Sequence, residues 1–176
     1  MNIKEFEKKI GYAYNNVDLL KLALTHSSYG NEVYKDKLHN NERLEFLGDA
    51  VLELTVSDYL FNEECNMPEG SLSRKRASIV CEPTLAMCAR EINLPEVLFM
   101  GKGEELTGGR FRDSIVSDAM EAVIGSIYLD GGIECAREFI NKFILADIKD
   151  KQLFVDSKTI SVSYTHLRAH ETSQDL

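Results

Sequence analysis

The stretch Asn40–Leu54, NNERLEFLGDAVLEL, is strongly helix-forming, yet it carries the acids Glu42, Glu45 and Asp49. At about 100° per residue these acids fall within a sector of roughly 60°. The opposite side of the same helix is apolar, with Leu44, Leu47, Val51 and Leu54. A solvated acidic face is the commoner reason for such a pattern, and Glu53 fits it. This helix alone therefore leaves a solvated face and a functional site both open.

A second acidic helix favours the functional site. In IVSDAMEAVIGSIYL, residues 115–129, Asp118 and Glu121 stand in a segment that is apolar almost all round, which predicts a buried helix. Buried carboxylates are costly unless a positive group compensates them. Ala122 and Gly125 on the same side would let the first acidic helix approach closely. Glu45 and Asp49 would then face Asp118 and Glu121, and four carboxylates suit Mg²⁺ or Mn²⁺ better than zinc. The alternative is satisfaction by the backbone or by distant arginines such as Arg43, Arg74 or Arg110.

The rest of the chain predicts an all-α protein. Its 176 residues, 44% of them hydrophobic, suit one domain with a real core. Helices are expected at residues 2–11, 16–30, 40–62, 68–80, 82–92, 115–132 and 133–148, with a polar, glycine-rich loop at 99–114. No alternating strand pattern of convincing length is visible.

Charge and cysteines exclude several functions. A formal net charge of -9 without basic tracts argues against a simple electrostatic clamp on nucleic acid. The four cysteines form no CxxC pair, which favours free thiols in a reducing cytoplasm over a zinc knuckle or a disulfide framework. No apolar run approaches the roughly 20 residues of a membrane span.

These motifs carry a resemblance to a known family. NERLEFLGDAVLEL resembles the signature of the ribonuclease III family, GKGEELTGGRFRDSIVSDAMEAVIGSIYLDGG is similar to its second acidic segment, and PEGSLSRKRASIV matches the helix between them. The resemblance implies a dimeric, all-α endonuclease domain that cuts double-stranded RNA with Mg²⁺, in rRNA and mRNA processing. The products would carry 5′-phosphate and 3′-hydroxyl ends with short 3′ overhangs.

The resemblance also implies roles for individual residues. Glu45, Asp49, Asp118 and Glu121 match the metal-binding acids, with Asp49 and Glu121 the least replaceable, and Glu42 and Glu69 match two further acids of the same cleft. Phe46 matches a position that inserts into a socket on the partner subunit; an ordinary core phenylalanine is the alternative. Phosphate contacts are expected from the basic residues near the cleft, Arg74, Arg76 and Arg110, although intramolecular ion pairs would explain each of them equally well.

Domain limits and competing functions complete the prediction. Residues 1–158 are expected to form the catalytic domain and residues 159–176 a short tail foreign to the family, with the double-stranded RNA-binding domain absent. An all-α nucleoside triphosphate pyrophosphohydrolase also binds Mg²⁺ through paired acids on helices. A non-catalytic dimeric module that binds RNA or protein is the other alternative.

Overall fold

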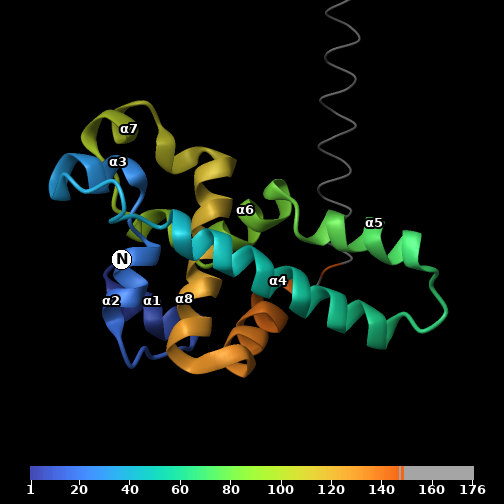
Figure 1. Ribbon diagram of the computed structural model, residues 1–176. Coiled ribbons are helices and arrows are strands. Elements are labelled where there is room, and N and C mark those ends of the chain that lie inside the picture. Colours follow the sequence, from blue (N-terminus) through green and yellow to red (C-terminus); the bar gives the residue numbers. More distant parts are fainter. Residues whose placement is uncertain (147, 149–176) are drawn as a thin grey trace, which may run out of the picture. The chain divides into compact units, whose positions relative to one another are not determined.

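The computed structural model describes residues 1–146 and 148 and is all-helical there, as expected (Figure 1). One isolated bridge, between Thr25 and Phe99, is the only β-type pairing in this part of the chain. The expected catalytic-domain limit at residue 158 and the tail at 159–176 lie outside the described residues. The helical elements are α1 (Ile3–Ile10), α2 (Val17–Ala23), α3 (Ser27–Tyr29), η1 (Gly30–Tyr34), α4 (Glu42–Glu63), α5 (Glu69–Ile79), α6 (Glu82–Glu91), η2 (Leu94–Val97), α7 (Lys102–Leu106), η3 (Gly109–Phe111), α8 (Asp113–Ile140) and η4 (Asn141–Leu145).

Helix α8 is the centre of the core and contacts α2, α4 and α6 (Figure 1). Its residues from Ile115 to Ile127 are buried except at Asp118 and Glu121, which are partly exposed. This pattern confirms the expectation of a buried second acidic helix. None of the described helices has the length and apolar character that crossing a membrane requires.

Helices α4 and α8 cross backbone against backbone. A Cβ atom placed on Gly48 would lie 1.8 Å from the carbonyl oxygen of Glu121, and one placed on Gly125 would lie 2.3 Å from the carbonyl oxygen of Leu44. Only glycine fits on either side, because any side chain would overlap the opposite main chain. The close approach expected at Gly125 is therefore present, and Gly48 is its counterpart on α4.

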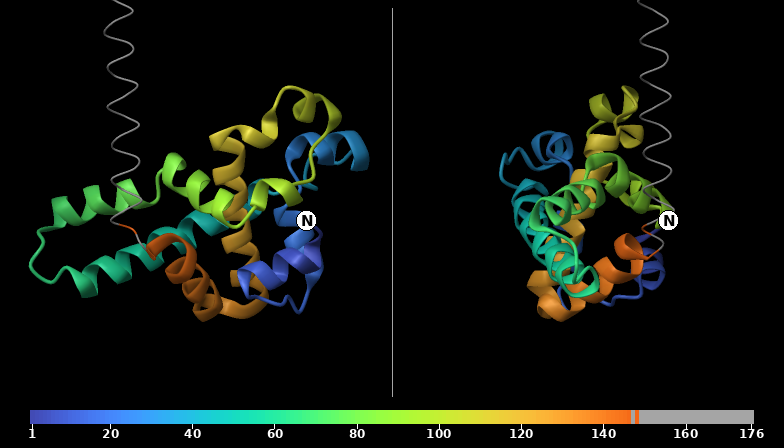
Figure 2. Two further views of the ribbon diagram at one scale, coloured as in Figure 1. Left: turned by 180° about the vertical axis from the view of Figure 1, so that it is seen from behind. Right: turned by 90° about the vertical axis from the view of Figure 1, so that its right-hand side faces the viewer.

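The C-terminal half of α4 runs beside α5 as an antiparallel pair of helices (Figure 1). Figure 2 shows the same pairing from behind. Residues 64–68 connect the two helices, and Pro68 precedes the first turn of α5 with extended backbone, φ -69° and ψ 155°. The fixed φ of proline and the negative charge of Glu69 both suit this start.

The expected helix at 16–30 is wrong in one respect, because it is broken in the middle. The main chain leaves α2 after Ala23 and pairs with Phe99: the Phe99 amide donates to Leu24 O at 2.8 Å, and the His26 amide donates to Phe99 O at 3.0 Å. These hydrogen bonds replace the ones that would have continued the helix. The expected loop at 99–114 is likewise partly ordered, as α7 and η3.

The change of direction expected at Gly131 and Gly132 is present. Helix α8 is interrupted at Gly132, whose φ of 83° is in the region that favours glycine. Just before it, the carboxylate of Asp130 accepts hydrogen bonds from the amides of Asn15 and Asn16 and from the hydroxyl of Tyr12, at 2.7–2.8 Å. One side chain thus fastens the loop between α1 and α2 to the end of α8.

Candidate metal centre

Three carboxylates meet where α4 and α8 cross. Glu45, Asp118 and Glu121 each offer an oxygen atom, and these atoms all lie within 4.8 Å of one another. All three side chains are partly exposed, so the group lies at the edge of the core and is open to a ligand. The Gly48–Gly125 contact explains the grouping, because it brings Glu45, three residues before Gly48, next to Glu121, four residues before Gly125.

No basic side chain neutralises this group. In the described part of the chain, Glu45, Asp118 and Glu121 form no ion pair with any lysine or arginine. The alternative that arginines such as Arg43, Arg74 or Arg110 compensate the acids therefore finds no support within residues 1–146. The site is left with uncompensated negative charge.

The cost of that charge appears in the pKa values. Burial, followed by the negative charges of Asp49, Asp118 and Glu45, raises the pKa of Glu121 to about 8. Burial and the neighbouring acids also raise the pKa of Glu45, and burial followed by Glu82 raises that of Asp118. Clustered carboxylates resist simultaneous ionisation, and a divalent cation relieves this repulsion.

Asp49 and Glu42 lie on the exposed rim of the same group. Asp49 is the neighbour whose charge acts most strongly on Glu121, and Glu42 acts on Glu45. Both side chains are exposed, one turn to either side of Glu45. The five acids expected on α4 and α8 are therefore gathered on one surface. Three of them have carboxylate oxygens close enough together to bind a single ion.

Glu69 is not part of this group within the protomer. It lies with Ser57, Leu60 and Phe61 in a cavity between α4 and α5, and its carboxylate accepts from Ser73 Oγ at 2.8 Å. Leu60 is fifteen residues beyond Glu45, which is roughly 22 Å along a helix. The cleft that Glu69 was expected to share with the other acids is not formed by one chain alone.

The three arginines expected to contact phosphate differ in how many hydrogen bonds and ion pairs they form within the protein. Arg110 binds both carboxylate oxygens of Glu105 and also donates to the carbonyl oxygens of Pro95 and Leu98, so it holds a loop together. Arg76 donates to Ser57 Oγ at 2.9 Å and lies 3.8 Å from Glu53. Arg74 is exposed and donates to Ser71 Oγ on its own helix. Of the three, Arg74 is the one best able to reach a phosphate.

Phe46 is not a core residue, because 81% of its side chain is exposed. It begins a line of apolar side chains on the outer face of α4, which continues with Leu54, 61% exposed, and Phe61, 74% exposed. The spacings of eight and seven residues keep these three within a sector of about 80°. Leu54, expected on the buried side, thus belongs to this exposed stripe.

Two residues near the acids were missed by the sequence analysis. Burial raises the pKa of Asp118, the charge of Glu82 adds to this, and His26 opposes it, so both side chains lie within electrostatic range. Glu82 begins α6, and His26 is at the break between α2 and α3. Neither has a sequence signal, because their approach to Asp118 depends on packing between distant segments.

The donor set suits a hard divalent cation. The three residues of the group offer carboxylate oxygens only, and none of them is a cysteine or a histidine. Mg²⁺ and Mn²⁺ prefer such oxygen ligands. Asp49 and Glu42 on the exposed rim would add further carboxylate oxygens near such an ion. The residues present therefore fit a Mg²⁺ or Mn²⁺ ion.

Comparison with known proteins identifies the family to which this fold belongs. Residues 16–148 match the family model described as ribonuclease-III-like. Ribonuclease 3 of Staphylococcus haemolyticus is 49% identical over 168 residues, which cover 93% of this chain and 69% of that protein, and Ribonuclease 3 of Staphylococcus aureus matches equally. The solved nuclease domain of ribonuclease III from Campylobacter jejuni has 43% identity and a TM-score of 0.76 over 81% of this chain and 96% of that one.

Fold and comparisons together define an all-helical endoribonuclease. The chain belongs to the ribonuclease III family.

Proposed function

We propose that the protein is a Mg²⁺-dependent endoribonuclease that cleaves double-stranded RNA in the cytoplasm, in the processing of rRNA and mRNA. The products carry 5′-phosphate and 3′-hydroxyl ends with short 3′ overhangs. The observation that carries the metal dependence is the group of Glu45, Asp118 and Glu121, partly buried, within 4.8 Å of one another and without a lysine or arginine partner in residues 1–146. Mn²⁺ can replace Mg²⁺, because both are hard cations with oxygen ligands.

The chain's own residues divide the work. Glu45, Asp118 and Glu121 hold the cation at the α4–α8 crossing, and Asp49 and Glu42 extend the acidic surface to the rim where a phosphate would arrive. When bound, the ion supplies a water of lowered pKa and positive charge for the phosphate oxygens. Glu121 has to lose its proton for this, because burial and four nearby acids raise its pKa to about 8.

The exposed stripe Phe46, Leu54 and Phe61 supports a homodimer. Large apolar side chains repeated along one helix face mark an interaction surface when they are this exposed. The related nuclease domain from Campylobacter jejuni is described as having a region involved in dimer formation. A two-fold interface is self-complementary, so the stripe would pair with its own copy, with Leu54 near the middle.

Such a pairing gives Glu69 a role. If the two α4 helices run antiparallel, the Phe61 end of one lies beside the Phe46 end of the other. Glu69 lies beside Phe61, and Glu45 is adjacent to Phe46 in sequence. Each acidic group would then receive Glu69 from the opposite protomer, which reconciles its distance within one chain with a shared cleft.

The cleavage proposal is tested with a long, perfectly paired RNA duplex. Incubation with Mg²⁺, with Mn²⁺ or with a chelator, followed by a denaturing gel, should give metal-dependent shortening and 5′-phosphate ends. Full-length RNA under all three conditions, with folded protein, would contradict it.

The shared site is tested by mixing two variants. Glu69→Gln and Glu121→Gln should each cut poorly alone. In the mixed dimer, one site has an intact Glu121 and receives an intact Glu69, so activity should return with nicking of one strand. No recovery on mixing would place Glu69 and Glu121 in the same protomer's site.

The alternatives are less well supported. A nucleoside triphosphate pyrophosphohydrolase does not fit the family to which the chain belongs. A non-catalytic module does not explain why the acids on α4 and α8 are all retained and held together. Release of pyrophosphate from nucleotides, with duplex RNA left intact, would reverse this preference.

A further inference from the structure

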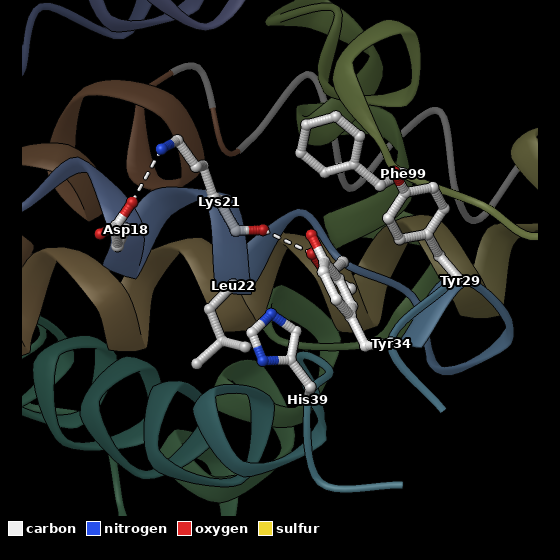
Figure 3. A pocket seen from close by; sticks show the side chains of 8 residues that line it. Asp18, Lys21, Leu22, Tyr29, Tyr34, His39 and Phe99 are labelled. Atoms are coloured by element: carbon white, nitrogen blue, oxygen red, sulfur yellow. Dashed lines mark hydrogen bonds and ion pairs between the residues drawn. The ribbon is translucent and has the colours of Figure 1, made fainter. Parts of the chain in front are cut away.

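An aromatic pocket lies at the break between α2 and α3. Figure 3 shows its lining, in which Tyr29, Tyr34 and His39 surround a cavity that reaches Phe99. The cavity has a volume of about 390 Å³, and its wall is completed by Asp18, Lys21 and Leu22 of α2 and by Thr25. It exists because the chain leaves α2 to pair with Phe99, so that residues 29–39 can fold over the gap.

The rings in this pocket form a continuous series. Tyr29 lies 5.6 Å from Phe99 and 5.8 Å from Tyr34 between ring centroids, and Tyr34 lies 4.2 Å from His39. The outer rings are open to solvent, since 51% of Tyr34 is exposed and His39 is exposed as well. Exposed rings of this kind offer a flat surface on which another planar ring can stack.

Free positive charge lies beside these rings. The segment from Tyr34 to His39 reads YKDKLH, and neither Lys35 nor Lys37 forms an ion pair within residues 1–146. Two nearby acids are engaged elsewhere: Asp18 pairs with Lys21 at 2.7 Å, and Glu32 accepts from the Lys102 amide at 2.7 Å. Asp36 lies between the two lysines, and its carboxylate accepts from the Leu38 amide at 2.9 Å. Lys35 and Lys37 therefore give this segment a local excess of positive charge beside the two exposed rings, in a chain of net charge -9.

The pocket is connected to the metal centre by two main-chain hydrogen bonds. The carbonyl oxygen of Thr25, a lining residue, accepts from the Asn41 amide at 2.9 Å. The carbonyl oxygen of Asn41 accepts in turn from the amide of Glu45, also at 2.9 Å. His39 precedes Glu42 by three residues, and the side chain of Asn40 between them accepts from the Glu42 amide at 3.1 Å. The wall of the pocket and the first turn of α4, which carries Glu42 and Glu45, are therefore held together by main-chain hydrogen bonds.

We propose that this pocket binds an unpaired nucleobase of the RNA substrate, close to the phosphate that is cut. The base stacks on Tyr34 and His39, and Lys35 and Lys37 meet the phosphates next to it. The inference rests on the proposed function and extends it, because it makes a bulged or looped-out nucleotide near the cut a feature that the nuclease domain itself recognises. Stacking tolerates any base, so the position of the unpaired nucleotide matters more than its identity.

Two RNA substrates and two variants test the proposal. The substrates are a perfect duplex and the same duplex with one unpaired nucleotide next to the cleavage position. The double variant Tyr34→Leu/His39→Leu removes the stacking surface at exposed positions, and Phe111→Leu, at a side chain 79% exposed elsewhere, is the matched control. Wild type and Phe111→Leu should bind the bulged RNA at least about 10-fold more tightly than the perfect duplex, and the double variant should lose this preference. Its cleavage of the perfect duplex should be unchanged.

A second readout does not depend on cutting. The fluorescent base 2-aminopurine, placed at the unpaired position, should be quenched by wild type and not by the double variant. Equal quenching by both proteins, or a bulge preference that survives in the double variant, would overturn the pocket assignment. Absence of cleavage of the perfect duplex by wild type would instead count against the proposed function and leave the fluorescence result to decide the pocket.

Discussion

Acids in the C-terminal half of α4 form ion pairs with basic side chains, whereas those in the N-terminal half form none in the part of the chain that the structure describes. In the C-terminal half, Glu53 lies 3.8 Å from Arg76, Asp58 lies 2.5 Å from Arg137, and Glu64, just after the helix, pairs with Lys75. In the N-terminal half, Glu42, Glu45 and Asp49 have no basic partner within the described residues, and burial followed by nearby acids raises the pKa of Glu45. One helix thus contains both satisfied and unsatisfied negative charge.

This difference separates structural acids from functional ones. Paired acids at a surface contribute little and tolerate change, because solvent screens them. Unpaired acids gathered on a buried helix lower stability unless they serve a function, and strongly shifted pKa values cluster at functional sites for this reason. The two halves therefore differ in what supplies positive charge: arginine and lysine in one half and, under the proposed function, a cation from solution in the other.

The largest expected effect comes from a substitution at the crossing of α4 and α8, which would disperse the unpaired acids. In Gly125→Ala, the new Cβ would lie 2.3 Å from Leu44 O, so α4 and α8 must separate and the acids with them. We expect a loss of about 3 kcal/mol or more in the free energy of unfolding, at the upper end for overpacking, together with loss of metal binding. Chemical denaturation measures the first and calorimetry the second. Gly103→Ala is the control, since nothing lies within 4 Å of that position, and an equal loss there would rule out the crossing as the cause.

A smaller effect comes from changing one acid of the unpaired group at the crossing, Glu121 of α8, and one acid of the paired half of α4, Asp58. Glu121→Gln should reduce Mg²⁺-dependent cutting by at least about 100-fold, because loss of even an outer partner of a metal ligand costs roughly 10-fold to 100-fold. Asp58→Asn, the same chemical change in a paired acid, should leave the cutting rate unchanged. Initial rates on duplex RNA measure both. Similar rates for Glu121→Gln and wild type would refute the site assignment.

The pH dependence of stability sharpens the comparison further. The pKa of Glu121 is about 8 in the folded protein, well above the ordinary value of 4.5, so the folded state holds its proton more tightly. That contribution to stability is fully present below pH 4.5 and is lost as pH rises through about 8. Glu121→Gln keeps the neutral form at every pH.

Metal-free Glu121→Gln should therefore melt at a higher temperature than wild type at pH 8 and at nearly the same temperature near pH 4.5. Thermal melts across this range measure the difference. Mg²⁺ should stabilise wild type at pH 8 and leave the variant unchanged. A variant less stable than wild type at pH 8 without metal would contradict the reasoning.

The smallest effect belongs to the paired half. Asp58→Asn removes the partner of Arg137, but 37% and 44% of these side chains are exposed, so the expected cost is below ~1 kcal/mol. The loss should shrink in high salt, which screens the pair. Denaturant unfolding at two salt concentrations measures this. A large, salt-independent loss would mean that Asp58 stabilises α4 by packing.

The sequence predicted the helical class and the acidic group because both follow from periodicity. Glu45, Asp118 and Glu121 recur at helical spacing beside small residues, so their shared face and close approach were visible before the fold. The C-terminal cap at Gly11, with φ 75°, was also predictable from local chemistry. Patterns within one helix predicted the faces of the acids correctly, but they placed Leu54 on the buried side, whereas it is exposed.

Features that depend on distant segments were not predictable. The helix breaks after Ala23 because the main chain pairs with Phe99, and no residue near Leu24 or Thr25 predicts this break. The hydrogen bonds that Arg110 donates to the carbonyl oxygens of Pro95 and Leu98 could not be predicted from the sequence either. Glu69 was expected beside the other acids, but it lies with Leu60 and Phe61 near the far end of α4, because α5 packs there.

The contact between Gly48 and Gly125 has a consequence for how this protein can diverge. The two helices meet through main-chain atoms, so the spacing of the carboxylates does not depend on which apolar side chains fill the surrounding core. Descendants can exchange leucine for isoleucine or valine around the crossing and inherit the same geometry, whereas adding a single methyl group at either glycine removes it. Catalytic architecture and core composition are thereby free to evolve at different rates.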